Sequence, residues 1–268
     1  MVPIQSLGYR TDVMVRLLSG SVVEEHSDYT VVRTPASPGF WWGNFLLMPA
    51  VPSLGDVEPW EAWFVAEFPA AKHRAFGLDT TDGKTGDPAA LAALGTSTRV
   101  NAVMSAAALR EPSPPDLELR LFDGPDWAQL EVLRSAVYAT PDDDPAETGD
   151  EAALVAQQVA ASKELVGDAH GAWLGAFDQG RLVAALGIVS DGSGVARYQS
   201  VETHPDYRRR GLARRLVYDA AVLAADRFDA RELVIVADPD DHAFTLYESL
   251  GFATVELQVE IIRTLTSN

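Results

Sequence analysis

The pattern of apolar and polar positions along the chain predicts a mixture of strands and helices throughout. In the first part it predicts strands over 29–34, 40–48, 72–79 and 98–109, and helices over 58–68 and 87–94. In the second part it predicts strands over 117–122, 172–177, 182–190, 195–203, 232–237 and 254–264, and helices over 127–138, 151–165, 212–226 and 240–250. This order predicts an α/β protein with a mixed sheet.

A proline-rich segment separates the two parts. Residues 111–116 read Glu-Pro-Ser-Pro-Pro-Asp, and three prolines in four residues disfavour both a helix and a central strand. We therefore expect two domains, 1–112 and 113–268. Both parts end in a helix with Leu-Gly at its end, followed by a long strand. The first part could be a partial copy of the second, or the similarity could be that of any two α/β segments.

The segment His204 to Arg215 carries the clearest chemical signal. It joins a predicted strand to a predicted helix, so it brings free backbone N–H groups and the positive end of a helix dipole to one point. Gly211 lets the backbone approach a ligand closely, and Ala213 keeps the first helical turn small. The surrounding arginines offer charge-assisted hydrogen bonds. These features predict a site for a phosphate or pyrophosphate.

Two motifs in the second part resemble those of one enzyme family. Arg208-x-x-Gly211-x-Ala213 is similar to the acyl-CoA signature (R/Q-x-x-G-x-G/A) of the GNAT N-acetyltransferases. Downstream, Asp240-x-x-Ala243-x-x-Leu246-Tyr247-x-x-x-Gly251-Phe252 resembles the family's second signature, N-x-x-A-x-x-L-Y-x-x-x-G-F. The resemblance covers roughly residues 116–265. It implies the GNAT acyl-CoA N-acyltransferase fold for this part. Together with the similarity between the two parts, it leads us to expect a tandem arrangement with a degenerate N-terminal half and a competent C-terminal copy.

The resemblance also implies acetyl-CoA as co-substrate and a role for each matching residue. Backbone groups of Val201 and Thr203 would pair with the pantetheine arm. The pyrophosphate would lie over the loop and first helical turn, which comprise Arg208, Arg209, Arg210, Gly211, Leu212, Ala213 and Arg214. The hydroxyl of Tyr247 would protonate the departing CoA thiolate after direct attack by the acceptor amine.

Two positions make the resemblance less complete. Asp240 stands where the family often has asparagine, so its hydrogen bond to CoA is in doubt, and Asp238 or Asp241 competes with it as helix cap. Glu202 is the nearest candidate for the general base, although its side chain alternates with Val201 and Thr203 and could instead be solvated or salt-bridged. His204 and a water relay are the other candidates.

Composition limits the partners. A net charge of −18 disfavours nucleic acid and membrane surfaces as ligands, and 13 basic against 27 acidic residues follow Pro112. This acidity and the acidic loop 141–147 favour a cationic small-molecule amine as acceptor. A role of the acidic residues in solubility alone explains both features equally well.

No cysteine is present, and His26 and His73 lack any metal-type spacing, so we expect no metal. No apolar run is long enough for a membrane helix and no secretory signal is seen, which favours a cytoplasmic protein. Its oligomeric state, monomer or homodimer, stays open at this point.

The favoured function is therefore an N-acetyltransferase that moves acetyl from acetyl-CoA to a primary amine. One alternative is a GNAT-like module that binds acyl-CoA without turnover. The other is an unrelated phosphate or nucleotide binder that shares only the Arg/Gly loop, which the Tyr247 motif disfavours.

Overall fold

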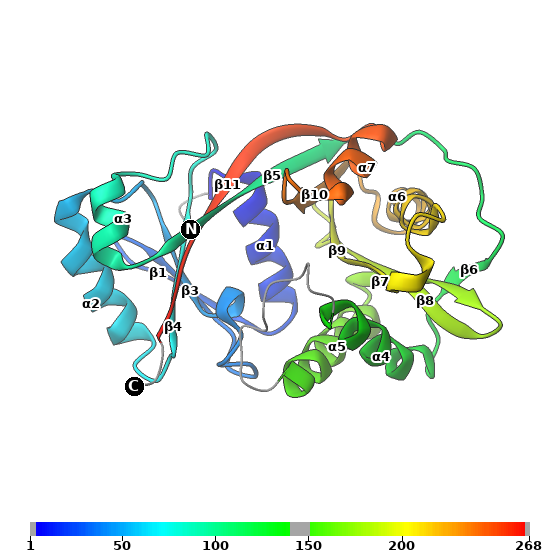
Figure 1. Cartoon of the computed structure of the whole chain (residues 1–268), viewed down its shortest axis with the longest axis horizontal. Coiled ribbons are helices and arrows are strands. Elements are labelled where there is room, and N and C mark those ends of the chain that lie inside the picture. Colours follow the sequence, from blue (N-terminus) through cyan, green and yellow to red (C-terminus); the bar gives the residue numbers. More distant parts are fainter. Residues whose placement is uncertain (1–3, 140–150, 266–268) are drawn as a thin grey trace. The chain divides into compact units, whose positions relative to one another are not determined.

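The computed structural model describes residues 4–139 and 151–265, and within this part no helix is long and apolar enough to cross a membrane. Contacts divide the chain into two compact units. Unit 1 comprises 1–103, 236–239 and 254–268, and unit 2 comprises 104–235 and 240–253. The mixed α/β class predicted from the sequence is confirmed (Figure 1).

Unit 1 is a mixed sheet with helices on both faces. Its helices are α1 (Leu7–Leu18), α2 (Val57–Glu67) and α3 (Pro88–Leu94), with short 3-10 turns at Trp41–Gly43 and Leu54–Asp56. Its strands follow the order β1 (Val22–Glu25), β2 (Thr30–Arg33), β3 (Phe45–Met48), β4 (His73–Leu78), β11 (Ala253–Thr264) and β5 (Ser97–Ala106). Strands β3 and β4 are parallel and α2 connects them, whereas β4 and β11 are antiparallel.

Neighbouring residues of β4 show which helix covers which face. A Cβ at Gly77 would lie 2.6 Å from the ring of Tyr9 in α1, so α1 packs directly on the backbone there. The ring of Phe76 instead contacts Trp60 in α2, at a centroid distance of 5.2 Å. Because successive residues of a strand point to opposite faces, α1 and α2 cover opposite faces of this sheet.

Unit 2 contains mixed strands in the order β10-β9-β8-β7-β6. The strands are β6 (Glu118–Leu121), β7 (Gly171–Asp178), β8 (Arg181–Val189), β9 (Val195–Thr203) and β10 (Glu232–Ala237, the last two residues in unit 1). Its helices are α4 (Asp126–Tyr138), α5 (Glu151–Gly167), α6 (Leu212–Phe228) and α7 (His242–Leu250), with a 3-10 turn, η3, at Pro205–Tyr207. Helices α4 and α5 lie on one side of strands β7–β9 and α6 on the other (Figure 1). Every residue of β8 after Arg181 is buried, as expected of a central strand covered on both faces.

Two sequence predictions need correction. Helix α1 and strand β1 were not predicted, although Ser6 caps α1 by accepting a hydrogen bond from the N–H of Tyr9. The strand predicted over 40–48 is a 3-10 turn followed by the shorter β3. The domains 1–112 and 113–268 stay a prediction; the two contact units divide the chain differently, with the proline-rich segment inside unit 2 and nearly all of β11 in unit 1.

The aromatic residues of the first part form the core of unit 1, where they pack against one another. Trp60 and Phe64 are buried in that core, and Trp42 and Trp63 pack against it. His73 is also buried and lies between the rings of Trp41 and Phe64. Burial lowers the pKa of His73, which favours a neutral ring at neutral pH. These residues therefore serve to pack the core of unit 1.

Candidate cofactor and catalytic site

Strand β9 carries a bulge beside the predicted reaction centre. Ala185 of β8 pairs with Glu202, but Gly187 pairs with Gln199, so two residues of β9 lie opposite one of β8. Ser200, in the bulge, has a φ of 50°. The extra residue changes the alternation of side chains from that point on.

The partner strand of β9 leaves it before this bulge. Strand β10 is parallel to β9, and their paired residues end at Arg197 and Val234. Thr203, at the end of β9, has a buried hydroxyl with no hydrogen-bond partner among the described residues. Val201 and Thr203 therefore lie on a stretch of β9 without a β10 partner, where backbone and hydroxyl groups can form hydrogen bonds with the amide groups of a ligand.

The start of α6 has the features of an anion site. Gly211, its N-cap residue, has a φ of 79° and gives no side-chain cap, and no acidic residue lies in the first turn. The first-turn N–H groups of Leu212, Ala213 and Arg214 make no hydrogen bond to any residue that the structure describes. Helices α1, α3 and α7, in contrast, are each capped by a Ser or Asp side chain. An uncapped helix start of this kind binds phosphate groups through its N–H donors and its dipole.

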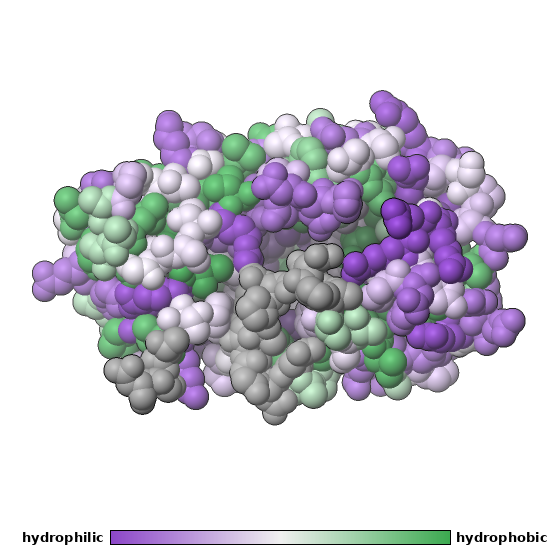
Figure 2. Space-filling view, in the orientation of Figure 1, coloured by the Kyte–Doolittle hydropathy of each residue, from purple (hydrophilic) through white to green (hydrophobic). Residues whose placement is uncertain are grey.

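Arginines surround this helix start, and two contacts fix the preceding turn. Arg208, Arg209, Arg210 and Arg214 are exposed, and the surface over η3 and the first turn of α6 is strongly hydrophilic (Figure 2). The hydroxyl of Tyr207 donates to Asp178 at 2.6 Å, and the guanidinium of Arg210 lies over the Tyr207 ring at 4.5 Å. The loop predicted from the sequence is therefore present, with its cations directed to solvent.

Tyr247 lies in α7, and its side chain is only 5% exposed. Its ring packs edge-on against Phe252, which in turn packs against Tyr198. Burial raises the pKa of Tyr247 well above its usual value, and the nearby Asp241 carboxylate raises it further. The hydroxyl makes no hydrogen bond to any described residue. It therefore holds its proton at neutral pH and is free to donate it.

Glu202 is held in a buried ion pair. Its Oε1 accepts a hydrogen bond from Nε of Arg134 in α4 at 2.7 Å, and both side chains are less than 10% exposed. A second guanidinium nitrogen of Arg134 donates to Gln158 in α5 at 3.3 Å. The pair thus links β9 to both helices on one face of the sheet. A carboxylate engaged in this way is a poor proton acceptor for a substrate, so the geometry favours the salt-bridged interpretation of Glu202 over the general base.

We expect Glu202→Gln to lower the free energy of unfolding by about 3 kcal/mol, because it leaves the buried Arg134 guanidinium without its counter-charge. Urea denaturation measures this change, and the exposed Glu248→Gln is the control. The double variant Arg134→Met with Glu202→Gln should recover most of the loss. If Glu202→Gln instead keeps the stability of the wild type, and its turnover no longer rises with pH on the acidic side of the profile, Glu202 is the general base.

The other predicted residues near the site are placed as follows. The cap of α7 is Asp241, whose Oδ1 accepts from the N–H of Ala243 at 3.1 Å, so Asp241 and not Asp240 caps this helix. The Nε2 of His204 lies 3.0 Å from Arg181, and its Nδ1 accepts from the N–H of Asp206. The acidic loop 141–147 lies outside the described residues.

Within its described residues, unit 1 has no counterpart of the arginine loop. Helix α2 connects the parallel strands β3 and β4, as α6 connects β9 and β10. Just before α2, however, the carboxylate of Asp56 accepts hydrogen bonds from the N–H and hydroxyl of Ser53. These bonds lower the pKa of Asp56, and Glu58 adds a second acid in the first turn of α2. Negative charge therefore occupies the helix start at which a phosphate would bind.

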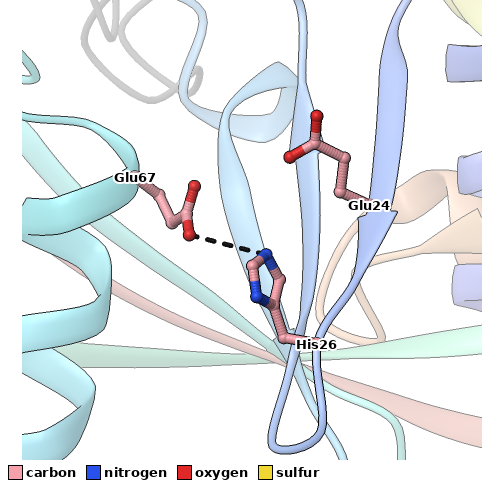
Figure 3. A group of neighbouring side chains, drawn as sticks. All are labelled: Glu24, His26 and Glu67. Atoms are coloured by element: carbon pink, nitrogen blue, oxygen red, sulfur yellow. Dashed lines mark ion pairs between the residues drawn. The ribbon is translucent and has the colours of Figure 1, made fainter.

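Unit 1 also holds a cluster that the sequence spacing did not reveal. His26 lies 3.5 Å from a carboxylate oxygen of Glu67, with Glu24 facing them from β1 (Figure 3). The guanidinium of Arg33 already pairs with Glu67 at 2.9 Å and lies 3.9 Å from Glu24. Since Arg33 pairs with both carboxylates, the cluster is an ion-pair network on the surface of this unit.

Comparisons with known proteins agree with the fold. Residues 134–252 match the family model described as Acetyltransferase (GNAT) family. No curated protein matches the sequence. Among solved structures, a functionally unknown conserved protein from Staphylococcus epidermidis is 16% identical with a TM-score of 0.69, and the match covers 90% of this chain and 92% of that one.

Two further solved structures carry the family's name. A GCN5-related N-acetyltransferase from Kribbella flavida is 15% identical with a TM-score of 0.63, and the match covers 96% of this chain and 95% of that one. A tandem GNAT protein from the clavulanic acid biosynthesis pathway is 13% identical with a TM-score of 0.52, with coverage of 79% and 69%. At such identities these likenesses show the fold. Residues 134–252 are therefore similar to the GNAT acetyltransferase family, and the N-terminal part folds as a second, GNAT-like copy.

Proposed function

We propose that the chain is an N-acetyltransferase that transfers acetyl from acetyl-CoA to a primary amine, with the chemistry in unit 2. The observation that carries the proposal is the uncapped start of α6, with its free N–H groups and exposed arginines, beside a strand that has lost its partner. The first feature fits the pyrophosphate of acetyl-CoA and the second fits its pantetheine amides. Acetyl-CoA supplies the activated thioester.

The residues of the chain have separate tasks in this reaction. Backbone N–H groups of β9 near the bulge polarise the thioester carbonyl, which stabilises the charge that develops in acyl transfer. Tyr247 gives its proton to the leaving thiolate. The acceptor amine attacks directly, and the site gains rate by holding both reactants in place. With Glu202 paired to Arg134, the ammonium proton leaves through water or His204.

The acceptor we propose is a small cationic amine. Support comes from the net charge of −18, because a strongly acidic protein attracts cations over long range. The absence of nucleic-acid and membrane partners, the cytoplasmic location, and the monomeric or dimeric state stay predictions from composition.

A second candidate function is acyl-CoA binding without turnover. The observation that favours it is the ion pair of Glu202, which leaves the site without an accessible carboxylate base on β9. Release of free thiol from acetyl-CoA in the presence of a panel of amines separates the two functions. A protein that binds acetyl-CoA but never releases thiol faster with any amine would be the binding module.

Binding itself is tested by calorimetric titration of acetyl-CoA against a matched pair of glycine variants. We expect Gly211→Glu to weaken binding by more than about tenfold, because it brings a negative charge to the helix start that holds the pyrophosphate. Gly192→Glu is the control, since both glycines have a φ near 80° (79° and 81°) and open space around a Cβ. Equal binding by the two variants would contradict the proposed site, and no binding by the folded wild type would contradict the proposed function.

A further inference from the structure

A cavity of about 490 Å³ lies next to the start of α6, entirely within unit 2. It has three walls: the segment 110–115, the helix start at Arg210, Gly211 and Arg214, and the end of α7 at Ser249 and Leu250. The first wall is the proline-rich segment that follows the GNAT-like copy in the chain. No motif in the sequence singled it out as part of a binding site.

The first three residues of the proline-rich wall are held in place. The N–H of Arg110 donates to the carbonyl of Leu250 at 2.8 Å, and a guanidinium nitrogen of Arg110 donates to the carbonyl of Ser249 at 3.3 Å. Arg215 of α6 holds the next two residues through the Glu111 carboxylate and the Pro112 carbonyl, each at 3.3 Å. Because these contacts anchor residues 110–112 and the prolines that follow restrict the backbone, Arg110 is positioned at the cavity before any ligand arrives.

The charge of this cavity is unusual for the chain. The protein has 39 acidic and 21 basic residues, yet Arg110, Arg210 and Arg214 have no carboxylate partner within the described ranges. The acid in the lining, Glu111, is paired with Arg215. Three guanidinium groups without counter-charges around one cavity favour an anion with more than one phosphate group.

We infer that this cavity takes the 3′-phosphorylated adenosine end of CoA, and that Arg110 is a binding residue for the 3′-phosphate. The inference rests on the proposed function. If the thioester end follows β9 and the pyrophosphate lies on the N–H groups of α6, the remaining part of CoA continues from the pyrophosphate. The cavity adjoins those N–H groups through Gly211 and Arg214, so it is the space available to that part. The segment between the two copies thereby becomes part of the co-substrate site.

The test compares three ligands by calorimetry: CoA, dephospho-CoA and adenosine 3′,5′-bisphosphate. We expect the wild type to bind CoA about tenfold more tightly than dephospho-CoA, from one charge-assisted contact to the phosphate. Arg110→Gln keeps a donor for the Ser249 carbonyl but removes the charge. It should weaken binding of CoA and of the bisphosphate by about the same factor and leave dephospho-CoA unchanged. Arg227→Gln, an exposed arginine in the last turn of α6, is the control.

Each outcome separates the inference from the proposed function. Equal affinity of the wild type for CoA and dephospho-CoA, or equal weakening of both by Arg110→Gln, overturns the role of the cavity while CoA binding stands. Binding of the bisphosphate without binding of CoA supports the cavity and overturns the proposed function. A wild type that binds none of the three overturns both. Thermal unfolding of each variant checks that the fold is kept, and the wild-type comparison stands even if Arg110→Gln fails to fold.

Discussion

A chain cut after Pro112 is expected to yield an N-terminal fragment that does not fold, even though the sequence alone predicts a domain there. The reason is β11, which lies at the C-terminal end of the chain but pairs with β4 over six residues, from Val259–Leu78 to Thr264–His73. Val259 and Ile261 are fully buried in the core of unit 1. Without β11, one edge of β4 loses its hydrogen-bonding partner and the core of unit 1 loses the buried side chains of Val259 and Ile261. Circular dichroism and amide proton spectra of the fragment measure this directly.

A point substitution in β11 tests the same idea in the intact chain. Ile261→Ala should lower the free energy of unfolding by about 2–5 kcal/mol, because it empties space in a closed core. Val255→Ala, on the same strand with the side chain 54% exposed, should change it by less than about 0.5 kcal/mol. Urea denaturation compares the two variants. A folded fragment 1–112, or equal effects of the two substitutions, would mean that unit 1 does not depend on β11.

The second large effect is expected at Tyr247. Tyr247→Phe should lower kcat by about 10²- to 10⁴-fold, the usual contribution of a positioned general acid, with acetyl-CoA affinity unchanged. Because the hydroxyl has no hydrogen-bond partner in the described chain, its removal should leave the midpoint of thermal unfolding nearly unchanged. The measurement is thiol release with an amine that supports turnover. Tyr218→Phe, on α6 and also without a hydroxyl hydrogen bond to a described residue, is the matched control.

The pKa of Tyr247 gives a further check on this role. Burial raises it above 10, so the neutral phenol persists through neutral and mildly alkaline pH. Wild-type kcat should therefore show no loss from Tyr247 deprotonation between about pH 7 and pH 9. Full turnover by Tyr247→Phe would show that the thiolate leaves without this proton. A fall in both affinity and stability would show that the tyrosine only supports the packing of Phe252.

Local signals in the sequence predicted most elements that carry the candidate site. The start of α6 follows from Gly211 and the arginines, and the position of Tyr247 in α7 follows from the spacing to Gly251 and Phe252. These signals depend on residues within one or two turns of each other, and a sequence shows such neighbours directly. The resemblance to the GNAT family is confirmed by the family match over 134–252. The roles of the individual site residues stay predictions.

Long-range contacts decided what the sequence left open. The accessibility of the Glu202 carboxylate depended on Arg134, which is 68 residues away in the sequence and pairs with it from helix α4. The place of Arg110 in a cavity depended on the end of α7, and the pairing of β11 with β4 joined residues nearly 200 positions apart. The sequence by itself determined most of the elements, the resemblance to the family and the arginine loop before α6, because turns, caps and periodicity are local. The tertiary structure alone decided which carboxylate is paired, which strand completes unit 1 and which arginines share a cavity, since burial and strand pairing arise only when distant segments pack together.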